Sequence, residues 1–187
     1  STASCTTNSI APVIEVIGRR IGLVKAMMTT VHAYTASQKL VDGPAKNWRR
    51  GRAAAVNFVP TSTGAAVATT KVLPQYQGVF DGVAIRAPVP VGSISDITMV
   101  TQRPTSVDEV NQIFEEEAAS NRYRGVLGVT KEPIVSSDII KDPRGAVVDL
   151  TMTNVVGGDL VKVMSWYDNE WGYASQMVRE GVHMVTH

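Results

Sequence analysis

A helix is predicted to begin in the stretch Ser4-Cys5-Thr6-Thr7-Asn8, which precedes apolar residues at helical spacing. Those residues recur at i, i+3, i+4 and i+7, the period of one helix face: Ile10, Val13, Ile14 and Ile17. The hydroxyl and amide side chains ahead of them can accept hydrogen bonds from the free N–H groups of a helix start. We therefore expect Cys5, the one cysteine of the chain, at a helix N-terminus.

This position bears on the reactivity of Cys5. The thiolate is the reactive form of cysteine, and the dipole and unpaired N–H groups of a helix start stabilise a negative sulfur. We therefore expect the pKa of Cys5 to be lowered. Free cysteines are also commonly buried and inert. A nucleophile and a structural residue both remain open at this point.

Composition narrows the class of protein. The chain has 187 residues, of which 44% are hydrophobic and 19% charged, so we expect one ordinary globular domain. A net charge of +1 gives no basis for a nucleic acid or an anionic membrane as partner. A lone cysteine cannot form an intramolecular disulfide, and no apolar stretch approaches the roughly 20 residues that span a bilayer. We expect a cytoplasmic protein, and its abrupt beginning suggests a fragment.

Periodicity predicts the remaining elements. Strands are expected at Leu23–Ala33, Val79–Val89, Ser93–Gln102, Val147–Val155 and Leu160–Tyr167, with the second and third as neighbours and a hairpin turn at Val156-Gly157-Gly158-Asp159. Further helices are expected from Pro60 through Ala68, after a capping box at Ser106–Glu109, and from Trp171 to Val185. The result is an α+β fold with a mixed, mainly antiparallel sheet covered by helices.

Histidines could supply the base that a cysteine nucleophile needs. His32 ends the first buried strand, whereas His183 and His187 lie near the end of the last helix. His32 is the better candidate, although a structural histidine fits the spacing equally well. The acidic run Glu115–Glu117 is expected to be a solvated helix face, and no metal site is predicted.

Two further groups could bind a ligand. Thr63-Gly64 opens a helix, whose N–H groups can hold an anion. Arg86 lies in an apolar strand, where an unpaired charge is costly, so its partner is either a phosphate or a buried carboxylate. Asn169, between the last strand and the last helix, could fix the carboxamide of a planar ligand, or it could simply cap that helix.

Five motifs occur in order along the chain. They are Ser4-Cys5-Thr6-Thr7-Asn8, a strand-end Thr-Val-His 27 positions after Cys5, Ser62-Thr63-Gly64-Ala65-Ala66, an Arg-x-Pro strand at Arg86, and Trp166-Tyr167-Asp168-Asn169-Glu170-Trp171-Gly172-Tyr173. Together they resemble the catalytic C-terminal domain of phosphorylating glyceraldehyde-3-phosphate dehydrogenases. The resemblance covers residues 1–187, essentially the whole chain.

The resemblance implies an activity and a set of site residues. Cys5 would attack the aldehyde of glyceraldehyde 3-phosphate, His32 would take a proton as hydride leaves to a nicotinamide, and inorganic phosphate would release the acyl group as 1,3-bisphosphoglycerate. Substrate phosphate would be held by Thr35 and Arg86, and inorganic phosphate by Ser4, Thr6, Thr63 and Gly64. Asn169 would orient the nicotinamide carboxamide, with Tyr173 nearby. NAD is the expected cofactor, as Gly43-Pro44 suggests, with NADP possible.

The resemblance also implies partners that this chain lacks. No G-x-G-x-x-G turn occurs in the sequence, so an N-terminal Rossmann domain would be missing and neither cofactor should bind tightly to this chain alone. The isolated chain is therefore expected to be inactive or nearly so. The excursion Tyr34–Val59 would be an S-shaped loop between subunits of a homotetramer, its arginines mostly in interface ion pairs. Ser9 replaces a second cysteine, and Ser37 replaces an acidic residue near the substrate phosphate.

Two alternatives are kept. Erythrose-4-phosphate dehydrogenase would share the cysteine, the histidine and the fold, but this chain keeps the motifs at Thr63 and Asn169 as in the glyceraldehyde-3-phosphate enzymes. The chain could instead serve only as a binding or assembly module.

Overall fold

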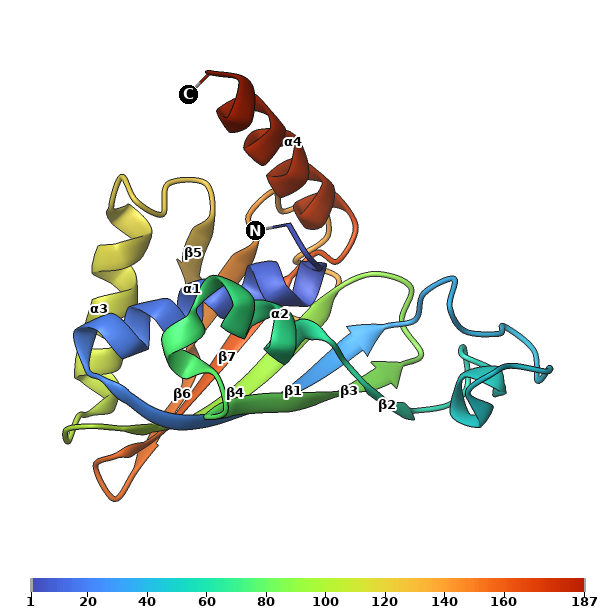
Figure 1. Ribbon diagram of the computed structural model, residues 1–187, viewed down its shortest axis with the longest axis horizontal. Coiled ribbons are helices and arrows are strands. Elements are labelled where there is room, and N and C mark those ends of the chain that lie inside the picture. Colours follow the sequence, from blue (N-terminus) through green and yellow to red (C-terminus); the bar gives the residue numbers. More distant parts are fainter. Residues whose placement is uncertain (1, 187) are drawn as a thin grey trace.

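A seven-stranded sheet forms the centre of the computed structural model, which describes residues 2–186 (Figure 1). The strands are β1 (Leu23–Ala33), β2 (Val59–Ser62), β3 (Phe80–Ala87), β4 (Ser93–Thr101), β5 (Leu127–Thr130), β6 (Ala146–Val156) and β7 (Leu160–Tyr167). The helices are α1 (Cys5–Arg20), α2 (Ala65–Val72), α3 (Val107–Ala119) and α4 (Trp171–Thr186), with short 3-10 turns η1 (Trp48–Gly51) and η2 (Pro74–Tyr76).

The order of the strands is β2-β3-β1-β4-β7-β6-β5. Only the β1–β3 and β5–β6 pairs are parallel, so the predicted mixed, mainly antiparallel sheet of an α+β fold is confirmed. The prediction that β3 and β4 are neighbours is wrong. The chain between them is as short as a hairpin connection, but β1 lies between them and pairs with both.

Helix α1 crosses the middle of the sheet and contacts β1, β4, β6 and β7, while α2 packs on β3 and α3 on β5 and β6. Figure 1 shows α1 and α2 next to each other on the same side of the sheet. The apolar face predicted for α1 is fully buried: Ile10, Val13, Ile14 and Ile17. The main hydrophobic core therefore lies between α1 and the sheet.

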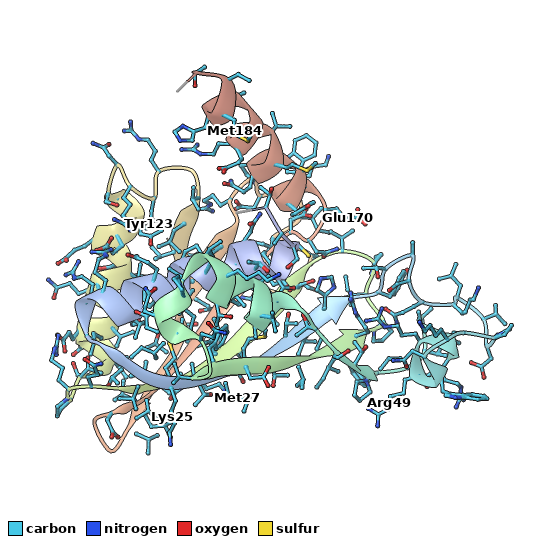
Figure 2. All side chains as sticks on the ribbon, in the orientation of Figure 1. Lys25, Met27, Arg49, Tyr123, Glu170 and Met184 are labelled. Atoms are coloured by element: carbon cyan, nitrogen blue, oxygen red, sulfur yellow. The ribbon has the colours of Figure 1, made fainter. Side chains whose placement is uncertain are left out.

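The other face of the sheet carries apolar side chains that remain exposed: Val24, Met27, Val83 and Leu160. Along β4, fully buried residues alternate with half-buried ones, which is the pattern of a strand with one face in a core. Figure 2 shows Met27 on the side of the sheet away from α1 and α2. No helix of the described residues covers this face in Figure 1.

Two segments extend from the sheet and its helices. The excursion between β1 and β2 contains η1 and reaches beyond the edge of the sheet, and Arg49 lies on the side of it that is nearest β2 (Figures 1 and 2). Helix α4 projects upward in Figure 1, beyond α1 and α2, and of its described residues only Gly172 is buried. The prediction of a helix from Pro60 is wrong, because Pro60 belongs to edge strand β2 and α2 begins only after its N-cap Gly64.

The acidic run on α3 is only partly a solvated face. Glu117 is buried and accepts hydrogen bonds from Arg19 and Arg20 of α1 at 2.7 Å each, so this correction follows from packing between the two helices. Glu116 pairs with Arg20 and Glu115 with Lys131. Within residues 2–186, no cluster of three or more metal-ligating side chains occurs, and no helix has the length and hydropathy needed to cross a membrane.

Candidate active site

The start of α1 is the first part of the site. Ser4 is the N-cap, with an extended backbone, and its Oγ accepts a hydrogen bond from the Thr7 amide at 3.0 Å. The predicted start of the helix at Cys5 is therefore confirmed. The first bond within the helix runs from the Asn8 amide to the Ser4 carbonyl at 3.0 Å, so the amides of Cys5 and Thr6 have no partner within the helix.

The end of β1 brings a base to this sulfur. His32 is the next-to-last residue of β1 and is buried, and its Nε2 lies 3.3 Å from Cys5 Sγ. Helix α1, which carries Cys5, packs on strand β1, which carries His32, through the hydrophobic core. The geometry is that of a thiol within hydrogen-bonding reach of an imidazole, the arrangement that activates a cysteine nucleophile.

Burial affects the pKa of both groups. The pKa of Cys5 is raised, because desolvation outweighs the opposing effects of the Thr6 amide and hydroxyl and of the Arg86 charge. The prediction of a lowered pKa is therefore wrong. The pKa of His32 is lowered to about 4 by burial and by the charge of Arg86. Both groups are neutral at pH 7.

Arg86 completes this cluster. It lies on β3 directly opposite His32 in the β1–β3 register, and its Nη1 is 2.7 Å from His32 Nδ1 and 3.1 Å from the Ala33 carbonyl. None of the ion pairs within residues 2–186 includes Arg86. Of the two partners predicted for Arg86, a buried carboxylate is therefore excluded within these residues. Its Nε is buried without a hydrogen bond. Burial and the nearby charge of Arg50 lower the pKa of Arg86.

The nitrogen of His32 that carries the proton depends on which of two contacts Nδ1 makes. Nδ1 is also 2.7 Å from the Ala33 carbonyl, to which it could donate a hydrogen bond. A guanidinium can only donate, so while Arg86 donates to Nδ1 the ring proton is on Nε2 and faces Cys5. If Arg86 moved away, Nδ1–H could donate to Ala33 and Nε2 would become a proton acceptor.

Two residues in this region were not singled out from the sequence. Tyr167 is fully buried, and its hydroxyl bonds Thr6 Oγ1 at 2.9 Å and Thr30 Oγ1 at 2.7 Å, below the His32 ring. Arg50 donates to Thr61 Oγ1 at 3.1 Å. The sequence signal for Tyr167 is its position at the end of a predicted strand, two residues before Asn169. Arg50 has no such signal, because only the fold brings it toward Arg86.

Asn169 lies between β7 and α4. Its Oδ1 accepts hydrogen bonds from the Gly92 amide and the Ser93 hydroxyl, both at 3.1 Å. The helix-capping role belongs to its neighbour Asp168, whose carboxylate accepts from the amides of Glu170 and Trp171 at 2.8 Å. Tyr173 donates to the Thr2 carbonyl at 3.0 Å, and no hydrogen bond within residues 2–186 joins it to Asn169.

The remaining predicted residues lie at separate element ends. Thr35 follows β1 and bonds Ser37 Oγ at 2.9 Å. Thr63 Oγ1 accepts from the Ala65 amide at 3.1 Å at the start of α2. A Cβ added to Gly64 would meet no atom within 4 Å, so the backbone there is open to a ligand. Among the described residues, no hydrogen bond connects Thr35, Thr63 or Gly64 to Cys5 or His32.

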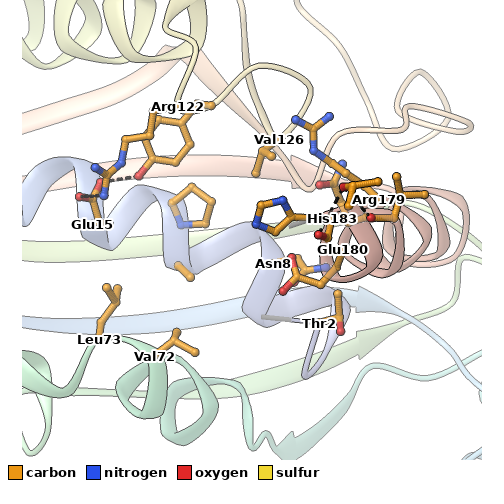
Figure 3. A pocket seen from close by; sticks show the side chains of 16 residues that line it. Thr2, Asn8, Glu15, Val72, Leu73, Arg122, Val126, Arg179, Glu180 and His183 are labelled. Carbon is orange, nitrogen blue, oxygen red and sulfur yellow. Dashed lines mark hydrogen bonds and ion pairs between the residues drawn. The ribbon is translucent and has the colours of Figure 1, made fainter.

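A separate groove of about 590 Å³ lies between α1, the end of α2, the α3–β5 connection and α4 (Figure 3). Asn8 and Glu15 of α1 and Glu180 and His183 of α4 contribute to its walls. None of Cys5, His32, Arg86 and Asn169 lines it. The groove is therefore distinct from the Cys5–His32 pair.

A family model described as the C-terminal domain of glyceraldehyde 3-phosphate dehydrogenase matches residues 4–169. The chain belongs to this family. Glyceraldehyde-3-phosphate dehydrogenase 2 of Streptomyces avermitilis is 50% identical over 178 residues, covering 95% of this chain and 53% of the relative. The glyceraldehyde-3-phosphate dehydrogenase of Mycobacterium tuberculosis is 52% identical over the same length, covering 95% and 52%. The resemblance inferred from five motifs is confirmed, and the chain spans about half the length of these relatives.

Proposed function

We propose that this chain is the catalytic domain of a phosphorylating glyceraldehyde-3-phosphate dehydrogenase, with Cys5 as nucleophile and His32 as base. The observation that carries the proposal is the 3.3 Å approach of Cys5 Sγ to His32 Nε2 at a helix N-terminus, beside Arg86. The names of the relatives, all glyceraldehyde-3-phosphate dehydrogenases, support this reaction for the full-length protein.

In the proposed reaction, Cys5 sulfur adds to the aldehyde carbon of glyceraldehyde 3-phosphate and gives a thiohemiacetal. His32 Nε2 takes the hydroxyl proton of that thiohemiacetal. NAD supplies the hydride acceptor when it is bound. Cys5 then carries a thioester, and attack by inorganic phosphate releases 1,3-bisphosphoglycerate and the sulfur. The Cys5 amide at the start of α1 can donate to the oxygen that becomes negative when a nucleophile adds.

Arg86 links substrate binding to the base. Arg86 and Arg50 are like charges in one region, and Arg86 has no carboxylate partner among the described residues, which favours an anion such as the substrate phosphate there. A phosphate that draws Arg86 from His32 Nδ1 leaves Nδ1–H to donate to the Ala33 carbonyl, 2.7 Å away. Nε2 then becomes the acceptor. The phosphate charge also offsets the cation that lowers the pKa of His32.

The other phosphate contacts are proposed from the positions of the residues at element ends. Thr35 is close in sequence to the end of β1, and Thr63 and Gly64 form the open start of α2. Ser4 and Thr6 flank Cys5, but the hydroxyl of Ser4 caps α1 and that of Thr6 bonds Tyr167. We therefore expect Thr6 to bind inorganic phosphate through its amide rather than its hydroxyl.

The residues present fit the nicotinamide end of NAD or NADP. With Oδ1 of Asn169 held by two donors, its Nδ2 is left to donate to the carbonyl of a carboxamide. Tyr173 is proposed as a neighbour of this group. The rest of the cofactor would need a Rossmann domain, which we propose for the other half of the full-length protein.

We further propose that the full-length protein is a homotetramer. The exposed apolar side chains on the open face of the sheet support burial against another subunit: Val24, Met27, Val83 and Leu160. A reducing compartment such as the cytoplasm is proposed because Cys5 must stay a thiol.

The test is a burst experiment on the full-length protein. With NAD and glyceraldehyde 3-phosphate but no inorganic phosphate, hydride transfer should stop after one NADH per Cys5, and added phosphate should restore turnover. Cys5→Ser should lose the burst and at least about a thousandfold of the turnover, and His32→Gln about a hundredfold or more. The matched control Ser137→Ala, at an exposed residue outside these contacts, should behave as the unmodified protein.

The proposal fails if Cys5→Ser keeps the burst. Equal or better turnover of erythrose 4-phosphate would favour the alternative dehydrogenase. A full-length protein with no burst on either sugar phosphate would leave a binding or assembly module as the better interpretation.

A further inference from the structure

Ser93, the first residue of β4, connects two parts of the site. Its side chain is almost fully buried, and its Oγ accepts a hydrogen bond from the Ala33 amide at 3.1 Å. The same hydroxyl donates to Asn169 Oδ1 at 3.1 Å. One hydroxyl therefore joins the residue after His32 on β1 to the amide side chain that follows β7.

The orientation of the Asn169 carboxamide follows from these donors. The Gly92 amide is a donor only, so the atom that it approaches must be the Asn169 oxygen and not the nitrogen. Gly92 has φ of +93°, and a Cβ on it would lie 2.3 Å from the Ser136 carbonyl. A fixed backbone and Ser93 thus hold the same oxygen, and the Asn169 NH₂ group is the end left for a ligand.

We infer that Ser93 is a positioning residue that acts through Asn169, holding its carboxamide so that only NH₂ donors are presented to a nicotinamide cofactor. This inference rests on the proposed function. The ligand group selected is a carbonyl acceptor, such as the oxygen of a carboxamide attached to a planar ring. A group that only donates would find no acceptor on Asn169, because its oxygen is already bonded twice.

The bond from Ala33 serves the same geometry. Ala33 is fully buried, and its carbonyl accepts a hydrogen bond from Arg86 Nη1 at 3.1 Å. Its amide is held by Ser93, so the hydroxyl sets the end of β1 relative to Asn169. Without it, a buried N–H would lose its partner and Asn169 would keep one of its two donors.

The test measures the dissociation constants of NAD and of ADP-ribose, which lacks the nicotinamide, in the full-length protein. Ser93→Ala is expected to weaken NAD binding about fivefold, as for loss of one hydrogen bond, and to leave ADP-ribose binding unchanged. Ser93→Cys, which fills similar space with a poor hydrogen-bonding group, should do the same, and Ser93→Thr should restore NAD binding. Thermal unfolding and the alkylation rate of Cys5 monitor folding in each variant.

A double-mutant cycle with Asn169→Ala separates this inference from the proposed function. If Ser93 acts through Asn169, Ser93→Ala adds no further loss to that variant. Three results would overturn the role of Ser93 but leave the proposed contact of Asn169 in place. They are equal weakening of NAD and ADP-ribose binding, additive losses in the double variant, and unchanged NAD binding in Ser93→Ala and Ser93→Cys when Asn169→Ala weakens it. Unchanged NAD binding in Asn169→Ala would instead remove the proposed cofactor contact, and with it this inference.

Discussion

His32 makes the stability of the chain depend on pH. Its pKa is lowered from an ordinary 6.5 to about 4, so the unfolded chain takes up a proton before the folded chain does as pH falls. The contribution of neutral, buried His32 to the free energy of unfolding is fully present above pH 6.5 and is lost as the pH falls toward 4. We expect the free energy of unfolding to decrease by about 3 kcal/mol from this residue between pH 7 and pH 4. Urea denaturation at several pH values measures it.

His32→Gln provides the comparison. The variant should lack this part of the pH dependence, so its unfolding free energy should approach or exceed that of the unmodified chain at pH 4. Between pH 7 and 9 His32 is neutral in both states, and the difference between the two proteins should be constant there. An identical slope for both proteins between pH 7 and 4 would show that His32 is not the group responsible.

The residue scale also shows where sequence patterns are insufficient. The helix start at Cys5 was predicted correctly, but the direction of its pKa shift was not. A helix N-terminus favours a thiolate, yet the sulfur is also enclosed by residues distant in sequence, and desolvation is the larger effect. Burial of this kind depends on packing of β1 and β3 beside α1, which no local pattern specifies.

At the scale of an element, the N-terminus of α1 depends on Ser4. Its Oγ accepts from the Thr7 amide at 3.0 Å, so Ser4→Ala should lower the free energy of unfolding by about 1 kcal/mol, and Ser4→Asn should restore most of it. Urea denaturation of the 187-residue chain at pH 7 is the measurement. Ser137 is exposed, and its side chain makes no hydrogen bond within residues 2–186. Ser137→Ala is therefore the matched control and should change the free energy of unfolding little. Equal effects of the two alanine substitutions would contradict a capping role for Ser4.

The elements themselves were largely predictable, and their arrangement was not. Continuous β-branched and apolar residues located β1 from Leu23 to Ala33, and two glycines with positive φ, Gly157 and Gly158, located the β6–β7 turn. β2 was missed because four residues around Pro60 carry too short a pattern. The position of β1 between β3 and β4 depends on pairing between segments far apart in sequence, parallel with β3 and antiparallel with β4, which no local pattern specifies.

At the scale of the whole molecule, we propose that the cofactor site is divided between this chain and the other half of the full-length protein. The contact proposed for Asn169 would give a nicotinamide one or two hydrogen bonds, and the sequence has no phosphate-binding glycine turn. Single hydrogen bonds contribute about 1 kcal/mol each, far short of the roughly 8 kcal/mol of a micromolar ligand. We expect residues 1–187 alone to bind NAD more weakly than about 1 mM by calorimetry and to oxidise glyceraldehyde 3-phosphate at under about 1% of the full-length rate. Iodoacetamide should still alkylate Cys5 in this chain, which shows that the nucleophile is accessible. Oxidation of the aldehyde by the isolated chain at the full-length rate would mean that Asn169 and its neighbours hold the cofactor without a second domain.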